Sequence, residues 1–230
     1  EYAVSDPRFQ YVGMDHCGKA GLMRNEGIKR AKGEYLLFLN NDVEIITENW
    51  LEEMLQLCQQ KDVGMAGAKL YYPDDTIQHA GVVVGLGGVA AHVLCKLPRD
   101  AEGYMGRLRC VQEISAVTAA CMMVKTSVFK AVGGFDEELK VAFNDIDLCM
   151  KVRKYGVKIV FTPYAELYHY ESKSRGMEDT PEKQLRFSRE VNCFRRKWER
   201  ELLKGDPYYN PNLTLNNTDC SLRKQEKNGD

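Results

Sequence analysis

The sequence predicts an α/β fold built on a doubly wound, mostly parallel sheet. Five consecutive apolar residues at 35–39 indicate a strand buried on both faces, as in the middle of a parallel sheet. Amphipathic helical segments alternate with apolar runs around this strand, which is the order typical of a sheet covered by helices. The apolar run ends abruptly at Asn40, Asn41 and Asp42. Ligands of open α/β sheets bind outside the carboxyl ends of strands, so we expect these side chains at a ligand site.

The composition is that of an ordinary globular protein. The 230 residues suffice for one large domain or two small ones, and the net charge of −1 argues against general nucleic-acid binding. No apolar run approaches the roughly 18 residues of a membrane-spanning helix. The eight cysteines include no C-x-x-C pair, and most lie in apolar runs. They are expected to be small buried hydrophobic residues in a reducing compartment, which indicates a cytosolic protein.

The first half of the chain alternates between predicted strands and helices. Gly33 is suited to end the first helix and Thr47 to cap the second. The predicted elements are a strand at 8–14, a helix at 22–31, a strand at 35–39, a helix at 47–60 and a strand at 63–68. The alternation is lost at 69–109. The glycine-rich run at 81–88 matches neither phosphate-loop spacing, so a β-excursion or a mobile loop is expected there.

The second half returns to the same alternation and ends in a long helix. Thr180 is the expected N-cap of this helix, Pro181 its first residue and Gly205 its end. Residues 216–230 are expected to form a charged, frayed tail. The other predicted elements are a strand at 121–125, a short helix from Ser127 to Gly133, a helix at 145–155 and a strand at 158–161 that Pro163 ends.

Asp42 is a candidate metal ligand. A carboxylate at the tip of a strand is a hard oxygen ligand, suited to Mg²⁺ or Mn²⁺ carrying a diphosphate. The alternative is a polar turn in which Asp42 caps the next segment.

Asp145 and Asp147 lie in the first turn of a predicted helix, where the helix dipole favours the anionic form. Both could be capping carboxylates. Side chains two residues apart on a helix do not share a face, so at most one of them can point into a cleft.

His169 and Arg175 are further candidates from the region before the last helix. His169 follows an apolar run and could be either a hydrogen-bonded core residue or a ligand. Arg175 stands beside a glycine and suits a phosphate, although a surface ion pair is equally consistent. The basic residues of the long helix are expected to form its solvated face, with contact to acidic lipid as the alternative.

Several motifs resemble family 2 glycosyltransferases of the GT-A fold. The resemblance starts with GKAGLMRNEGI at 18–28 and continues with AKGEY at 31–35 and LNND at 39–42. It goes on in family order through AVTAAC at 116–121, VGGFDE at 132–137, NDIDL at 144–148 and YAELYH at 164–169. The similar region covers about residues 9–215.

The resemblance implies inverting transfer of a sugar, of the hexosyl type, from a nucleotide donor to an acceptor hydroxyl in surface polysaccharide or glycan assembly. It implies a divalent metal, Mg²⁺ or Mn²⁺, and a partial Rossmann-like GT-A domain at 1–215. By position in the motifs, the implied roles are general base for Asp145, metal ligands for Asp42 and His169, donor contacts for Arg24, Asn40, Asn41 and Arg175, and support of the acceptor or base for Asp147 and Thr118. Two positions depart from the family: Asn40 replaces a carboxylate, and Asn144 stands where many relatives have Glu.

The implied partners are a nucleoside-diphosphate sugar and a glycan or lipid-linked glycan acceptor, without nucleic acid. Peripheral contact with the inner face of the membrane is a further expectation. In the family an opening strand and helix and a second strand precede the segment at 9–31, so we expect a longer chain with a missing N-terminal segment. The alternatives are a sugar nucleotidyltransferase, which would carry a basic Gly-rich phosphate loop near its N-terminus, and a non-catalytic glycan-binding or scaffold module.

Overall fold

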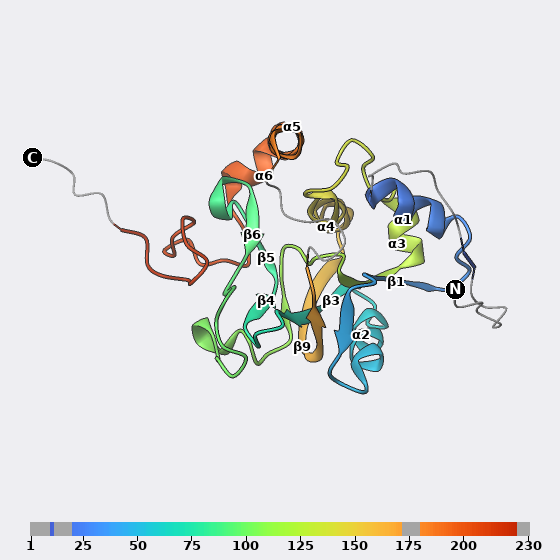
Figure 1. The fold of residues 1–230 in the computed structure, drawn as a ribbon, viewed down its shortest axis with the longest axis horizontal. Helices are drawn as coiled ribbons and strands as arrows, with labels where there is room; N and C mark the ends of the chain where they lie inside the picture. The colour runs from blue at the N-terminus through green and yellow to red at the C-terminus, as the bar shows by residue number, and fades with distance from the viewer. Residues whose placement is uncertain (1–9, 12–19, 172–179, 225–230) are drawn as a thin grey trace, which may run out of the picture.

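The computed structural model describes residues 10–11, 20–171 and 180–224, whose elements surround one central sheet (Figure 1). The strand order is β1–β8–β3–β9–β2, with β4 paired to β3 and β7 to β9, while β5 and β6 form a separate hairpin. The strands are β1 (Tyr35–Leu39), β2 (Val43–Ile45), β3 (Val63–Tyr71), β4 (Ile77–His79), β5 (Val82–Val84), β6 (Ala90–His92), β7 (Gln112–Glu113), β8 (Cys121–Lys125) and β9 (Lys158–His169). The helices are α1 (Ala20–Ile28), α2 (Trp50–Cys58), α3 (Thr126–Ala131), α4 (Asn144–Tyr155), α5 (Pro181–Lys197) and α6 (Glu199–Lys204), with 3-10 turns η1 (Leu86–Gly88) and η2 (Tyr104–Gly106).

The α/β class is confirmed, but the sheet is mixed rather than mostly parallel. β1 and β3 both pair antiparallel with β8, and β3 pairs parallel with β9, so β1, β3 and β9 share one direction. β2, β4 and β7 run the other way, like β8. The reason lies in the long connection before β8. This connection ends at the carboxyl end of β1, where Cys121 pairs with Leu39, so β8 has to run back antiparallel.

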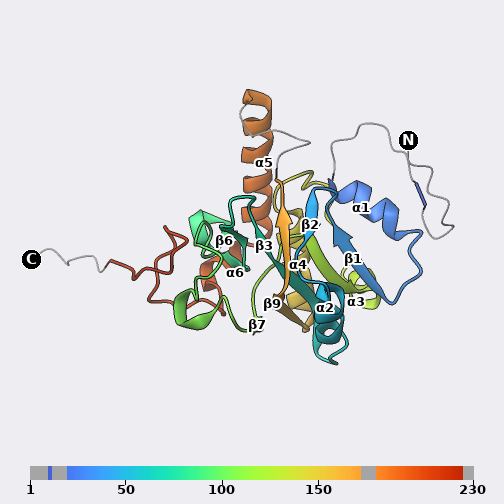
Figure 2. The same ribbon diagram turned by 60° about the horizontal axis from the view of Figure 1, so that its bottom comes forward.

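The sheet is covered by helices on both faces. β3 is buried along its whole length, and its side chains alternate between the two faces. Ala66, Ala68 and Leu70 belong to the core that includes α2, whereas Met65 and Tyr71 belong to the core that includes α3, α4 and part of α5. The N-terminal part of α5 projects beyond this core, as Figure 2 shows.

Gly67 allows the segment 116–120 to pass close over β3. A Cβ atom at Gly67 would lie 2.3 Å from Cγ1 of Val117, closer than two carbon atoms can approach. The absence of a side chain in the middle of β3 therefore fixes how near Val117 and the neighbouring Thr118 come to the sheet.

Most predicted elements are confirmed, and β1 and β8 have the predicted bounds. β9 is longer than predicted because Pro163 lies where its register with β3 shifts, between the pairs Gly67–Phe161 and Lys69–Glu166. Such an irregularity tolerates a residue without an N–H. The predicted strand at 8–14 falls mostly outside the described residues.

The glycine-rich run at 81–88 is part of a hairpin, as the expected β-excursion requires. Val84 pairs with Ala90, and the N–H of Gly85 donates to the carbonyl of Val89 at 2.8 Å. Gly85 and Gly87 have φ angles of 97° and 64°, left-handed values that this turn requires and that glycine adopts readily.

The predicted frayed tail is wrong for residues 216–224. Thr214 N–H donates to the carbonyl of Ser221, and Arg223 N–H donates to the carbonyl of Asn212, both at 2.8 Å. Cys220, directly before Ser221, is buried. Backbone pairing therefore holds this segment against 212–214, and residues 225–230 lie outside the described part.

The described cysteines are free thiols, and Cys58, Cys121 and Cys149 are buried in the core. Burial raises the pKa of Cys58 and of Cys121 to about 12, so both behave as small hydrophobic residues. No helix within the described ranges is long and apolar enough to cross a bilayer.

Candidate active site

A cavity of about 550 Å³ lies beyond the carboxyl end of β1 and beside the start of α4. Many of the residues that the sequence singled out meet there, from five separate regions of the chain. The lining includes Arg24, Asn40, Asn41, Asp42, Thr118, Asp145 and His169 among the predicted residues, together with Ala20, Met23, Leu39, Ala120, Val141, Asn144 and Glu171.

Asp42 and His169 are brought together by the pairing of β2 with β9. Val43 lies opposite His169 in this antiparallel pair, so Asp42 sits next to the histidine. Tyr170 N–H donates to the carbonyl of Asp42 at 2.8 Å and closes the pair. Asp42 Oδ1 is then 3.2 Å from His169 Nε2.

Gln78 fixes the tautomer of His169. Its amide nitrogen donates to the His169 carbonyl at 3.2 Å and to Glu171 Oε2 at 3.5 Å, which orients the amide. Its Oε1, which can only accept, is 2.7 Å from His169 Nδ1, so Nδ1 carries the proton. A neutral His169 therefore presents the lone pair of Nε2 towards Asp42 Oδ1 and the amide nitrogen of Asn40, which lies 3.1 Å from Nε2.

The arrangement of Asp42 and His169 fits a divalent cation. Asp42 Oδ1 is enclosed and receives no hydrogen bond from the residues that the structure describes, while Nε2 offers a second electron pair 3.2 Å away. Two electron-pair donors at this separation can bind one ion, and Gln78, whose Oε1 accepts the Nδ1 proton, holds the imidazole with Nε2 turned towards that position. Within the described ranges no three His, Cys, Asp or Glu side chains cluster as a metal site. A carboxylate with one further ligand is nevertheless sufficient for Mg²⁺-type sites that also use substrate phosphates and water.

Asp145 is held at the cavity wall by backbone N–H groups. Its Oδ2 accepts from Ala119 N–H at 3.1 Å, and its Oδ1 accepts from Ile146 N–H at 2.9 Å. Phe143, the residue at the N-cap of α4, has the left-handed angles φ 61° and ψ 5°. This turn directs the first residues of α4 towards the cavity.

Asn144, one of the two departures from the family pattern, pairs with Arg24. Arg24 Nη1 donates to Asn144 Oδ1 at 2.9 Å, and Asn144 Nδ2 donates to the Val141 carbonyl at 2.6 Å. A neutral amide thus positions the guanidinium without adding negative charge at this contact. The side chain of Asn144 links Arg24 to the start of α4.

A histidine pair lies behind the segment that carries Thr118. His79 Nδ1 is 2.8 Å from His92 Nδ1, and Thr118 N–H is 3.5 Å from His79 Nε2. Burial lowers the pKa of His79 well below its usual value, and the neighbouring imidazoles lower it further. Burial also lowers the pKa of His92. Both rings are therefore neutral near pH 7.

Asp147 does not line the cavity. It is fully buried, and its carboxylate accepts from Trp198 Nε1 at 2.8 Å, with Lys197 Nζ at 2.7 Å and Lys151 Nζ at 3.0 Å. These contacts join α4 to the end of α5. Asp147 thus anchors the C-terminal helix, whereas Asp145 faces the cavity.

Gln78 and Glu171 were not predicted from the sequence as residues of the site. Both lie near His169, but Gln78 comes from a three-residue strand in a segment without periodicity, so no sequence pattern marks it. Glu171 lies two residues after His169, within a polar cluster, which was the only available signal. Arg175 lies outside the described residues.

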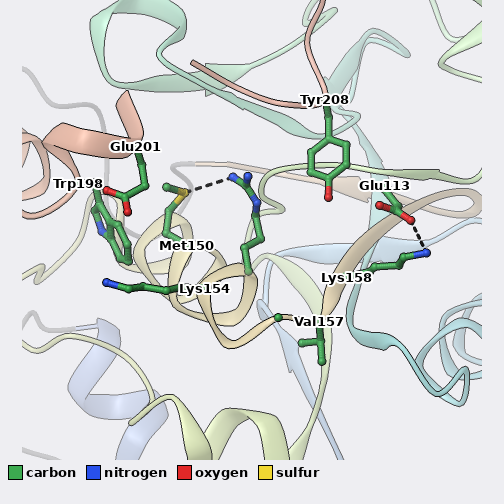
Figure 3. Close-up of a pocket in the computed structure, with 10 residues that line it drawn as sticks. Glu113, Met150, Lys154, Val157, Lys158, Trp198, Glu201 and Tyr208 are labelled. Carbon is green, nitrogen blue, oxygen red and sulfur yellow. Dashed lines mark hydrogen bonds and ion pairs between the residues drawn. The ribbon is translucent and has the colours of Figure 1, made fainter. Parts of the chain in front are cut away.

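A second cavity of about 430 Å³ lies at the opposite end of α4 (Figure 3). Three of its charged side chains have partners: Lys158 Nζ is 2.6 Å from Glu113 Oε1, and Arg153 Nη1 donates to Ser115 Oγ at 3.0 Å. It lies away from the strand tips that carry Asp42 and His169, so the cavity beside β1 is the candidate active site.

The mixed sheet with a polar cavity at the carboxyl end of β1 has the GT-A glycosyltransferase fold. A solved structure of GalNAc-T7 with UDP, GalNAc and Mn²⁺ covers 81% of this chain and 36% of its own at 15% identity, with a TM-score of 0.58. A mannosyltransferase from Pyrobaculum calidifontis, in complex with GDP-Man and Mn²⁺, covers 78% of this chain and 43% of its own at 14% identity, with a TM-score of 0.51.

Residues 8–190 match the model of a glycosyltransferase-like family, and the chain belongs to this family. The protein y4gI of Sinorhizobium fredii, which has no assigned function, is 54% identical over 87% of this chain and 22% of its own length. The O-antigen biosynthesis protein RfbC of Myxococcus xanthus is 39% identical over 98% of this chain and 17% of its own. The chain thus spans about a fifth of the length of these curated relatives.

Proposed function

We propose that this chain is a metal-dependent, inverting glycosyltransferase domain that moves a sugar from a nucleoside-diphosphate donor to an acceptor hydroxyl. The observation that carries the proposal is the meeting of the Asp42–His169 pair and Asp145 in one cavity. The Asp42–His169 pair is suited to bind a cation, and the separate carboxylate of Asp145 is suited to accept a proton.

Asp42 and His169 would hold Mg²⁺ or Mn²⁺ on the donor side. When bound, the ion supplies Lewis-acid stabilisation of the charge that develops on the leaving diphosphate. Asn40 and Asn41 would contact the donor beside these ligands, and Arg24, fixed by Asn144, would add positive charge there. Thr118, which also lines the cavity, would border the acceptor.

Asp145 would act as the general base. Its carboxylate would take the proton of the acceptor hydroxyl during attack on the anomeric carbon, a contribution of about 10²–10⁴ in rate. A base that activates the acceptor directly is what a single displacement needs, and a single displacement inverts the anomeric centre.

The proposed setting is assembly of a surface polysaccharide, with a glycan or lipid-linked glycan as acceptor. Its support is the similarity to RfbC, which is an O-antigen biosynthesis protein. The proposal includes a cytoplasmic location at the inner face of the membrane.

The test is a thermal-shift screen of UDP, GDP and dTDP with and without Mn²⁺, followed by hydrolysis of the matching nucleotide sugars. A nucleotide that binds the native state raises Tm. Asp42→Ala should remove the Mn²⁺-dependent part of this shift. Asp145→Asn should keep the shift and lower turnover by about 10²–10⁴.

Asp100→Asn, an exposed aspartate away from the cavity, is the matched control and should leave both measurements unchanged. Wild-type turnover in Asp145→Asn would remove this residue from the mechanism. A wild-type protein that binds nucleotide with Mn²⁺ but turns over no sugar nucleotide would instead be a non-catalytic binding module.

A further inference from the structure

Glu190 is a buried carboxylate on α5 that reaches across to the loop before α4. Its exposed fraction is only 3%. Its Oε1 accepts from Val141 N–H at 2.9 Å, and its Oε2 accepts from Ala142 N–H at 3.1 Å. On the helix itself, Arg186 Nε lies 3.6 Å from Oε2. A carboxylate withdrawn from water in this way needs such donors, so its position and that of the loop depend on each other.

The loop that Glu190 holds leads directly into the proposed base. Val141 and Ala142 precede Asp145 by four and three positions. Phe143, which follows Ala142, adopts the left-handed conformation that starts α4. The ring of Phe143 packs against Phe187 and Phe194 of α5, with centroid distances of 5.7 and 5.4 Å. α5 therefore holds this turn by polar and by apolar contacts.

The same loop also reaches the donor side of the cavity. Val141 donates its N–H to Glu190 and accepts from Asn144 Nδ2 through its carbonyl, while Asn144 Oδ1 accepts from Arg24. Val141, Asn144 and Asp145 all line the cavity. A displacement of the loop would move the base and the partner of the donor-side arginine together.

We infer that Glu190 is a positioning residue for the transfer reaction, acting on Asp145 through the loop 141–143. This role rests on the proposed function, in which Asp145 is the base. Glu190 does not line the cavity. Its two hydrogen bonds fix the turn at Phe143, and this turn sets where the first residues of α4 place Asp145 against the N–H of Ala119.

The test compares Glu190→Gln with the wild type in hydrolysis of UDP-, GDP- and dTDP-sugars with Mn²⁺. The amide offers one acceptor oxygen, so one of the two loop N–H groups loses its partner. We expect kcat to fall by about 10- to 100-fold, because a shift of about 1 Å at a reacting group has this effect. The Kd of the nucleotide with Mn²⁺, measured by calorimetry, should rise by less than about fivefold, because Asp42 and His169 belong to other elements and the loop reaches the donor only through Asn144 and Arg24.

Hydrogen exchange gives a readout that is independent of turnover. The amides of 141–147 should exchange about tenfold or more faster in Glu190→Gln, while those of β9 are unchanged. Glu182→Gln is the matched control, since Glu182 is an exposed glutamate on the same helix. If Glu190→Gln does not fold, Glu190→Asp takes its place, because the shorter carboxylate keeps the charge but cannot reach both N–H groups.

The outcomes separate this inference from the proposed function. Full turnover in Glu190→Gln, together with loss of turnover in Asp145→Asn, would overturn the role of Glu190 alone. Equal losses of kcat and nucleotide affinity in Glu190→Gln would make Glu190 a general structural residue and also overturn it. Full turnover in Asp145→Asn would refute the base assignment itself.

Discussion

Replacing Gln78 with leucine should weaken metal binding without removing either proposed ligand. Gln78 is 4% exposed, and its Oε1 accepts the His169 Nδ1 proton at 2.7 Å. Without this acceptor the ring can carry its proton on Nε2 instead and donate to Asp42 Oδ1, which lies 3.2 Å away. The alternative tautomer would therefore occupy the electron pairs of both ligands.

The expected loss follows from the usual effect of removing the partner of a metal-bound histidine. Such changes lower metal affinity by about 10- to 100-fold, which corresponds to about 1.4–2.7 kcal/mol. The lost contact to the His169 carbonyl should also lower stability by about 1–3 kcal/mol, since it leaves a buried acceptor unpaired.

Calorimetric titration of Mn²⁺ in the presence of the nucleotide diphosphate found by thermal shift measures the affinity. ¹⁵N NMR of the His169 ring reports the tautomer in the metal-free protein. Gln59→Leu, an exposed glutamine at the end of α2, is the matched control. A folded Gln78→Leu protein with wild-type Mn²⁺ affinity would refute the role of Gln78 and weaken the assignment of His169.

Two further predictions concern stability. Asp147→Ala should lower the free energy of unfolding by about 3 kcal/mol, because it leaves Trp198 Nε1 and the Lys197 ammonium without their buried acceptor; urea unfolding measures this, and a loss below about 1 kcal/mol would contradict the anchoring role. Burial lowers the pKa of His79 and of His92, so below about pH 6.5 the unfolded chain binds protons that the folded protein does not. The free energy of unfolding should therefore fall as the pH decreases below about 6.5. The expected slope is up to about 1.4 kcal/mol per pH unit for each histidine. Thermal melts between about pH 7.5 and 5.5 check this, with His92→Gln expected to flatten the profile; a flat wild-type profile would count against it.

The strands with clear ends were predictable from the sequence. β1 and β8 are short apolar runs bounded by polar residues, and both have the predicted bounds. The predicted strand was shorter than β9 because a proline such as Pro163 normally ends a strand. Only the pairing of β9 with β3 shows that a register shift accommodates this residue. A register shift between strands that are distant in the chain cannot be predicted from the local sequence.

The cavity residues that could be predicted from the sequence are those that lie at the ends of strands. Asp42 and His169 each terminate an apolar run, so their types and positions mark them. Gln78 and Glu190 act through contacts with residues far away in the sequence, such as the pairing of Gln78 with His169. A buried glutamine or glutamate has no distinguishing pattern before its partner is known, so these residues emerge only from the folded chain.

The segment 144–148 contains two aspartates that depend on different parts of the protein. Asp145 faces the cavity, and Asp147 is bound to Lys197 and Trp198 at the end of α5. Under the proposed mechanism, selection for catalysis acts on the first and selection for folding on the second. A descendant that lost the reaction would be free to replace Asp145 while still keeping Asp147, Lys197 and Trp198. A chain with that combination would be one that keeps the fold without the catalytic activity.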